Sequence, residues 1–191
     1  MTEDELKLPG YNPTWYDDAQ EMIAGSRLMA LRGSEIHEAW TLWGSSGWVD
    51  RAPVILVMGD TRLEVCARGV TQFSVTRDTL VMDSPVQASG PGGESGEPVW
   101  KKNENHELAA IVNKPITEVG AVEYQLDPMA RRRFKKEWVL SGIYLRFDKA
   151  HLEIFNGLDC NRMSNMPDRD HPVRYVSCAQ WPTLVSGGST R

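Results

Sequence analysis

Hydrophobic and polar residues alternate along several stretches of this chain, which is the pattern of β-strands with one buried face. In residues 143–147, Ile143, Leu145 and Phe147 fall on one face, with a tyrosine and an arginine between them. Residues 151–154 repeat the alternation after a turn. Together the two segments predict an antiparallel hairpin that packs one face against a core.

The chain also contains an internal repeat, at an offset of 80 residues. Residues 27–36 align with 107–116, and an apolar helical segment in each copy ends at Gly33 or Asn113. These residue types most readily take the left-handed conformation that follows a helix. An isoleucine comes three residues later in both copies and begins a predicted strand. In the first copy, a predicted hairpin with its turn at 59–61 corresponds to the hairpin of residues 143–154 in the second copy.

These patterns predict an α+β protein with a mainly antiparallel sheet built from two related helix-strand-hairpin halves. The halves comprise about 15–83 and 99–178, within a single domain that spans 1–191. The Gly- and Pro-rich segment 84–98 is predicted to be a flexible surface loop between them. Further expected elements are helices at 16–31 and 104–112, strands near 71–76, 79–82 and 173–178, and a long polar loop at 156–172.

The composition of the chain argues against a disordered protein and against a membrane-spanning one. The chain has 191 residues, of which 41% are hydrophobic, and its seven Trp are enough large apolar side chains to exclude wholesale disorder. Its longest apolar run, 53–58, is too short to span a bilayer. The acidic N-terminus has no apolar segment behind it, and the three Cys are far apart. We therefore expect a cytoplasmic protein with reduced thiols, no secretory signal and no membrane partner.

Charge is unevenly distributed. The net charge is −5, and residues 1–38 hold eight carboxylates against three basic side chains. An acidic surface repels phosphate, so we expect no direct nucleic-acid partner and instead favour a basic protein. The basic cluster Arg131–Lys136 can be interpreted as a nucleic-acid patch or as a solvated loop between strands, and the second interpretation is favoured.

Metal and cofactor sites need clustered ligands, and the sequence predicts neither a metal nor a cofactor. The chain has no Cys-x-x-Cys, and its four His are scattered. The densest group of potential ligands is Asp168, Asp170 and His171, which prolines frame as an exposed turn. The glycine-rich segment 90–96 lacks the strand, helix and lysine of a phosphate-binding loop.

The best candidate for a nucleophile is Cys160, in the long loop that also contains His171. No local pattern indicates activation of its thiol, so we expect a protein that is not an enzyme. The alternative is a small-molecule-binding or enzymatic β-rich domain with a site near Cys160 and His171.

Aromatic residues cluster around the first predicted strand. Trp40 should share a face with Leu42, and Trp43 should point the opposite way. Trp48 follows in a short Gly- and Ser-rich insert. Each Trp is interpreted either as core or, for Trp43 and Trp48, as an exposed anchor of an interaction surface.

Acidic residues at the start of the first helix complete the predicted binding surface. Asp17, Asp18 and Glu21 would attract a basic partner, whereas Asp17 and Asp18 can also be explained as complements of the helix dipole. The predicted partner-binding residues are therefore these three acids together with Trp43 and Trp48.

The helix-Gly-x-x-Ile-strand-hairpin pattern and the segment Leu152–Asp159 resemble small bacterial immunity proteins encoded beside polymorphic toxins. The resemblance covers the outline of residues 27–178. It implies a cytosolic inhibitor that binds and neutralises a toxin domain, frequently a nuclease or deaminase with a basic substrate face. It carries no position-specific motif, so it assigns no inhibitory residue.

Overall fold

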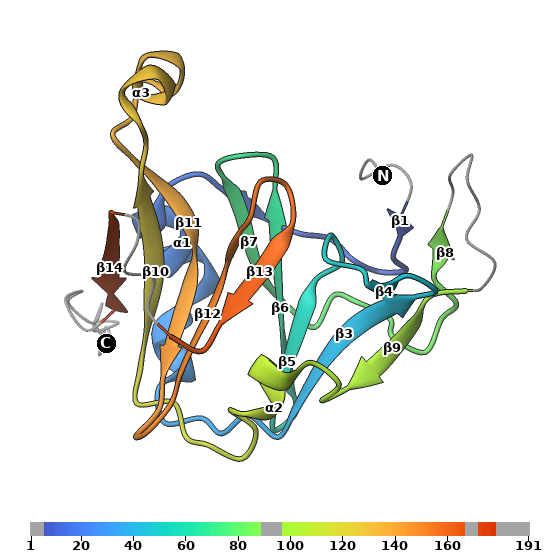
Figure 1. Ribbon diagram of the computed structural model, residues 1–191. Helices are drawn as coiled ribbons and strands as arrows, with labels where there is room; N and C mark the ends of the chain where they lie inside the picture. Colours follow the sequence, from blue (N-terminus) through green and yellow to red (C-terminus); the bar gives the residue numbers. More distant parts are fainter. Residues whose placement is uncertain (1–5, 89–96, 167–171, 179–191) are drawn as a thin grey trace, which may run out of the picture.

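The structure is a computed structural model that describes residues 6–88, 97–166 and 172–178, and it consists mostly of antiparallel sheet with a few short helices (Figure 1). The strands are β1 (Leu6–Lys7), β2 (Trp15–Tyr16), β3 (Glu38–Gly44), β4 (Gly47–Trp48), β5 (Val54–Met58), β6 (Thr61–Arg68), β7 (Gln72–Arg77), β8 (Gln87–Ala88), β9 (Val99–Lys102), β10 (Glu118–Gln125), β11 (Trp138–Arg146), β12 (His151–Asn156), β13 (Asn161–Ser164) and β14 (Val173–Ser177). The helices are α1 (Ala19–Ser26), the 3-10 helix η2 (Leu28–Leu31), α2 (His106–Ala109) and α3 (Pro128–Phe134).

Two sheets make up most of the molecule. The larger has seven strands in the order β2-β7-β6-β5-β3-β4, with β9 paired to β3, and the smaller has five in the order β13-β12-β11-β10-β14. A separate two-stranded ribbon joins β1 to β8. Within each sheet a four-stranded meander follows the chain, β3-β5-β6-β7 in the first and β10-β11-β12-β13 in the second. The segment 84–98 was predicted to be a flexible surface loop, but its Gln87–Ala88 form β8, which pairs with β1, and its Val86 is buried. Residues 89–96 of this segment lie outside the described residues.

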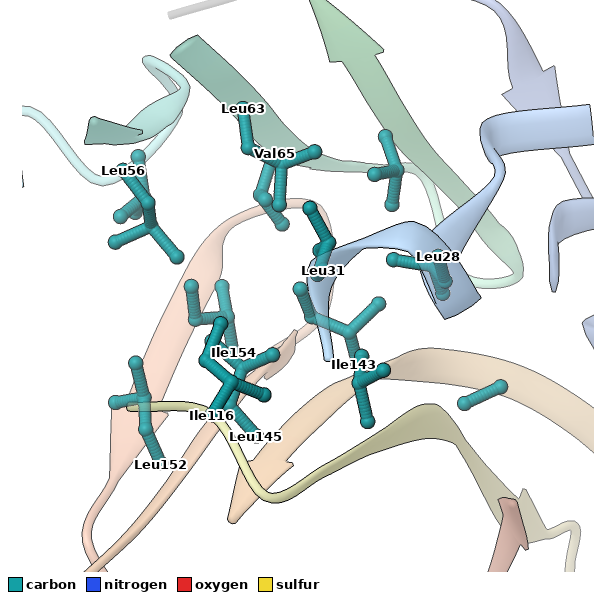
Figure 2. Packing of buried hydrophobic residues seen from close by; sticks show 14 of the residues in the cluster. Leu28, Leu31, Leu56, Leu63, Val65, Ile116, Ile143, Leu145, Leu152 and Ile154 are labelled. Atoms are coloured by element: carbon teal, nitrogen blue, oxygen red, sulfur yellow. The ribbon is translucent and has the colours of Figure 1, made fainter. Parts of the chain in front are cut away.

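The inner faces of the two sheets share one hydrophobic core. Figure 2 shows Leu28 and Leu31 of η2 between Val65 of the larger sheet and Ile143 of the smaller one. All of these side chains are buried, and each such leucine or isoleucine contributes about 1.5–3 kcal/mol to folding. A second, smaller cluster, consisting of Leu42, Ala52 and Val86 with Leu6, Leu8, Val49 and Trp100 packed against it, lies outside this core.

Backbone hydrogen bonds tie the two halves together reciprocally. The N–H of Gly33 donates to the carbonyl of Ile116 at 2.8 Å, and the N–H of Asn113 donates to the carbonyl of Ile36 at 2.7 Å. Gly33 has a φ of 84° and Asn113 a φ of 59°, which confirms the left-handed conformation expected for both.

The predicted helices are much shorter than expected. The stretch 16–31 divides into α1 and η2, because Arg27 takes a left-handed φ of 54° between them. Gly25 and Ser26, both weak helix formers, end α1. The predicted helix at 104–112 is the four-residue α2, which begins at the Asn105 cap.

Three further predictions were wrong. The stretch 156–172 is not one long loop, because Asn161–Ser164 form β13, which pairs with β12. Residues 79–82 do not form a strand, because the N–H groups of Thr79 and Leu80 donate to the buried carboxylate of Glu64 at 2.8 and 2.7 Å rather than to a neighbouring strand. The basic segment 131–136 is not a loop: most of it belongs to α3, whose first N–H groups are capped by Asp127. Figure 1 shows α3 projecting at the tip of the β10–β11 hairpin.

Candidate functional site

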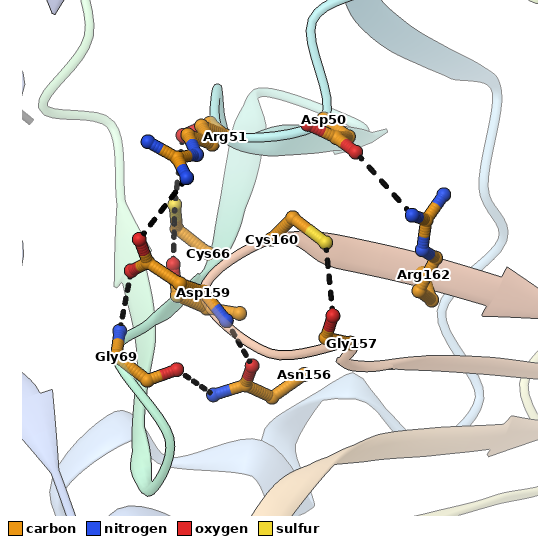
Figure 3. A network of polar contacts seen from close by, with 10 residues as sticks. Asp50, Arg51, Cys66, Gly69, Asn156, Gly157, Asp159, Cys160 and Arg162 are labelled. Atoms are coloured by element: carbon orange, nitrogen blue, oxygen red, sulfur yellow. Dashed lines mark hydrogen bonds and ion pairs between the residues drawn. The ribbon is translucent and has the colours of Figure 1, made fainter. Parts of the chain in front are cut away.

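The turn that contains Cys160 joins the two sheets. This turn, between β12 and β13, lies against the turn between β6 and β7 (Figure 3). The N–H of Asp159 donates to the carbonyl of Gly69 at 2.8 Å, and the N–H of Gly69 donates to the Asp159 carboxylate at 2.6 Å. The two turns are therefore held together by a reciprocal pair of hydrogen bonds, one of them charge-assisted.

Asn161 anchors this contact from inside. Its side chain is completely buried, accepts a hydrogen bond from the N–H of Ala67 at 2.8 Å and donates to the carbonyl of Ala52 at 2.8 Å. Both partners belong to the first half of the chain. We call residues 156–161, with their partners in 50–52 and 67–72, the latch.

The Cys160 thiol lies within the latch. It lies 3.2 Å from the carbonyl of Gly157, and burial, followed by the negative charge of Asp50, raises the pKa of the thiol. A raised pKa disfavours the reactive thiolate. His171, the other residue of the predicted alternative site, lies outside the described residues, as do Asp168 and Asp170.

A second polar cluster lies on the outer face of the five-stranded sheet. Glu153 accepts a hydrogen bond from Tyr175 at 2.6 Å and lies 2.7 Å from the His151 ring. Beside it, Tyr144 donates to Glu118 at 2.7 Å; this bond is the main reason that the pKa of Glu118 is lowered. The side chains of Tyr144 and Glu153 are buried, so the cluster acts as a hydrogen-bonded network that fixes β14 to its sheet.

The predicted acidic residues are held at the start of α1. Asp18 is the helix cap and accepts hydrogen bonds from the N–H groups of Gln20 and Glu21. Asp17 pairs with Lys136 at 3.1 Å, so the structure brings part of the acidic segment against the end of the basic cluster. Glu21 is exposed in the first turn.

The two predicted tryptophans face each other across β3 and β4. Trp43 and Trp48 are register partners, and Trp48 packs against the main core. The Trp43 indole donates to Thr41 at 2.9 Å and has the Lys101 ammonium 4.9 Å from its ring. Figure 1 places β4 far from α1, so these tryptophans and the acids of α1 do not form one surface.

A groove of about 560 Å³ lies on the outer face of the seven-stranded sheet. Its floor comes from neighbouring strands, with Glu38 and Trp40 of β3 beside Val57 of β5. Its walls are 82–86 on one side and 97–100 on the other. We call this feature the tryptophan groove, because Trp40 and Trp100 both line it.

One end of the groove already binds a cation from the same chain. The Lys102 ammonium lies 3.1 Å from the Glu38 carboxylate and 5.8 Å from the centre of the Trp40 ring. Glu38 also accepts a hydrogen bond from the Trp40 indole at 3.0 Å. The hydrogen bond from Lys102, followed by that from Trp40, lowers the pKa of Glu38, so its carboxylate is charged near neutral pH.

The rest of the groove carries uncompensated acidic and apolar groups. Asp83 and Glu97 are exposed and make no ion pair among the described residues. Val99 is 53% exposed at the rim. Arg62, which also lines the groove, pairs with Asp78 at 3.9 Å. A groove with indole rings, free carboxylates and an apolar rim suits a ligand that is both cationic and partly apolar.

Sequence reasoning placed Trp40 on the correct face but did not single out this groove. The alternation of β3 does separate Trp40 and Leu42 from Trp43, as expected. Trp100 and the segment 82–86 reach the groove only through β9 and the small second cluster. Those contacts are long-range, so no local signal indicated them.

Comparisons with known proteins do not assign a function: no protein family, no curated protein and no solved structure matches the chain. Within the described parts of the chain, no three His, Cys, Asp or Glu side chains are grouped as metal ligands would be. The helices of these parts are all too short or too polar to cross a bilayer.

Proposed function

We propose that this protein is a cytoplasmic, non-catalytic inhibitor of the immunity type, which neutralises a bacterial toxin domain by binding it directly. The observation that carries the proposal is the tryptophan groove, in which Trp40 and Trp100 lie beside Asp83 and Glu97, whose carboxylates make no ion pair within the described parts of the chain. A nuclease or deaminase toxin has a basic substrate face, and such a face is complementary to this groove in charge.

Energetic reasons favour a protein as the ligand. Tryptophan is enriched among the residues that dominate protein–protein affinity, where it fills a desolvated pocket. Carboxylates at the rim speed the encounter with a basic partner, but they are worth less to affinity. Glu21, at the start of α1, is exposed but does not line the groove. The acids of this segment can therefore attract a basic partner only over a longer distance.

The proposal expects a toxin gene beside this one, and the test is neutralisation of that toxin by the purified protein in the toxin's own activity assay. We expect one-to-one inhibition, weakened at least tenfold by Trp40→Ala, which corresponds to about 1.4 kcal/mol. The matched control is Trp138→Ala, on β11 of the other sheet, which removes a half-buried indole that does not line the groove. A toxin that neither binds the wild-type protein nor loses activity in its presence would refute the proposal.

We also propose that the two halves are related helix-strand-hairpin repeats. The two meanders have the same strand order, and the isolated bridge between Glu35 and Pro115 joins residues that are equivalent at the offset of 80. The proposal predicts that residues 27–66 superpose on 107–155, with η2 on α2 and hairpin on hairpin. A superposition that matched helix with strand would overturn it.

A further inference from the structure

We infer that the tryptophan groove receives an extended segment of the partner that carries arginine or lysine, added as a further strand to the edge of β9 that faces away from β3. The inference rests on the proposed function in taking that segment from a basic toxin domain. It goes further by naming the conformation of the segment and the two kinds of contact that hold it.

The first contact is main-chain pairing. The N–H of Asn103 donates to the carbonyl of Ala39 at 2.7 Å, so in this antiparallel pair Ala39, Thr41 and Trp43 direct their backbone groups towards β9. By the same alternation Trp100 and Lys102 direct theirs away from β3. Among the described residues β9 pairs with β3 alone, which leaves an edge that can accept a strand.

The second contact is cationic. Lys102 already lies over Trp40 and against Glu38, so this corner of the groove accepts an ammonium group in the protein as it stands. Asp83 and Glu97 offer two more carboxylates, neither of which has an ion-pair partner among the described residues. An arginine from the partner would suit them better than lysine, because its planar guanidinium both stacks on indole and binds carboxylate bidentately.

An extended segment satisfies both features together. In a strand, alternate side chains point to the same face, so every second side chain of a strand added to β9 would lie on the outer face of the sheet, beside Trp100 at the wall of the groove. From there a long arginine side chain can reach the carboxylates of the groove while its backbone pairs with β9. A small cation would leave the edge of β9 unpaired. A nucleic acid would bring phosphates against Asp83 and Glu97, which is repulsive.

The probe is a short synthetic peptide that alternates arginine with valine, titrated into the full-length protein with tryptophan fluorescence as the readout. We expect saturable binding that weakens as salt rises, because exposed charges are screened. Glu97→Lys should weaken binding at least tenfold, and Glu97 is exposed, so the variant should fold normally. The matched control is Glu35→Lys, which makes the same charge change at an exposed position outside the groove and should leave affinity within about twofold.

A second peptide, with proline replacing the central valine, tests the main-chain contact. Proline lacks an N–H and cannot continue a paired strand, so its affinity should also fall at least tenfold. Equal affinity of the two peptides would overturn strand addition. Equal binding to Glu97→Lys and wild type would overturn the groove as the site.

The same variants separate this inference from the proposed function. A toxin neutralised equally well by the wild type, Trp40→Ala and Glu97→Lys would overturn the groove as the binding site, here and in the proposed function, but it would still show that the protein is an inhibitor. Peptide binding at the groove with no effect on the toxin would have the opposite meaning, because it would support the groove and refute the inhibitor proposal.

Discussion

The latch allows a quantitative test of what holds the two sheets together. Replacing Asn161 with alanine removes an acceptor from the N–H of Ala67 and a donor from the carbonyl of Ala52. Asn161 is completely buried, so water cannot easily replace the lost partners. Each buried backbone group left unpaired costs about 1–3 kcal/mol. We therefore expect Asn161→Ala to lower the free energy of unfolding by roughly 3 kcal/mol.

Urea denaturation monitored by circular dichroism and tryptophan fluorescence would measure this change. With a denaturant dependence of about 2–3 kcal/mol per molar, a loss of this size moves the unfolding midpoint by roughly 1 M. The matched control is Asn12→Ala, since Asn12 is exposed and its one described hydrogen bond uses its backbone N–H. That variant should stay within about 0.5 kcal/mol of wild type. If Asn161→Ala were equally mild, the latch would not be a major source of stability.

Three further predictions concern other parts of the molecule. The lowered pKa of Glu118, held by Tyr144, adds stability that is present at neutral pH and lost as the pH falls below the ordinary carboxyl value, so Glu118→Gln should flatten the acid side of a stability–pH curve. A Cβ at Gly142 would lie 2.2 Å from the carbonyl of Ile154, so Gly142→Ala should destabilise by about 2 kcal/mol or more in thermal melts, and a melt unchanged from wild type would contradict this steric argument. Cys160→Ala should leave toxin neutralisation within about twofold of wild type, and a loss of orders of magnitude in a folded variant would indicate thiol chemistry.

Local patterns predicted the strands well. The alternation in 143–147 places Ile143 and Leu145 in the core, and the left-handed conformations at Gly33 and Asn113 follow from residue type. One local signal was overlooked, because Asp127 followed by proline is a common start of a helix and does begin α3. These features are determined by residues that are close in sequence, so they can be predicted from the sequence alone.

Features that depend on distant residues could not be predicted in this way. Glu64 holds the backbone of Thr79 and Leu80 from another strand, which prevents the expected strand at 79–82. The alternation of β11 places Tyr144 on the face that points away from the core, but the polar network on that face buries its side chain. The tryptophan groove likewise joins β3, β9 and the segment 82–86, whose proximity only the folded chain reveals.

The reciprocal hydrogen bonds between the halves also affect how the chain can fold while it is being synthesised. Ile36 cannot pair until Asn113 has left the ribosome, and at about 5–20 residues per second this delay is of the order of 4–15 s. During that interval the apolar face formed by Leu28, Leu56 and Leu63 has no second sheet to cover it. We therefore expect the nascent first half to bind chaperones, and the yield of the protein in cells to depend on them more than its final stability would indicate.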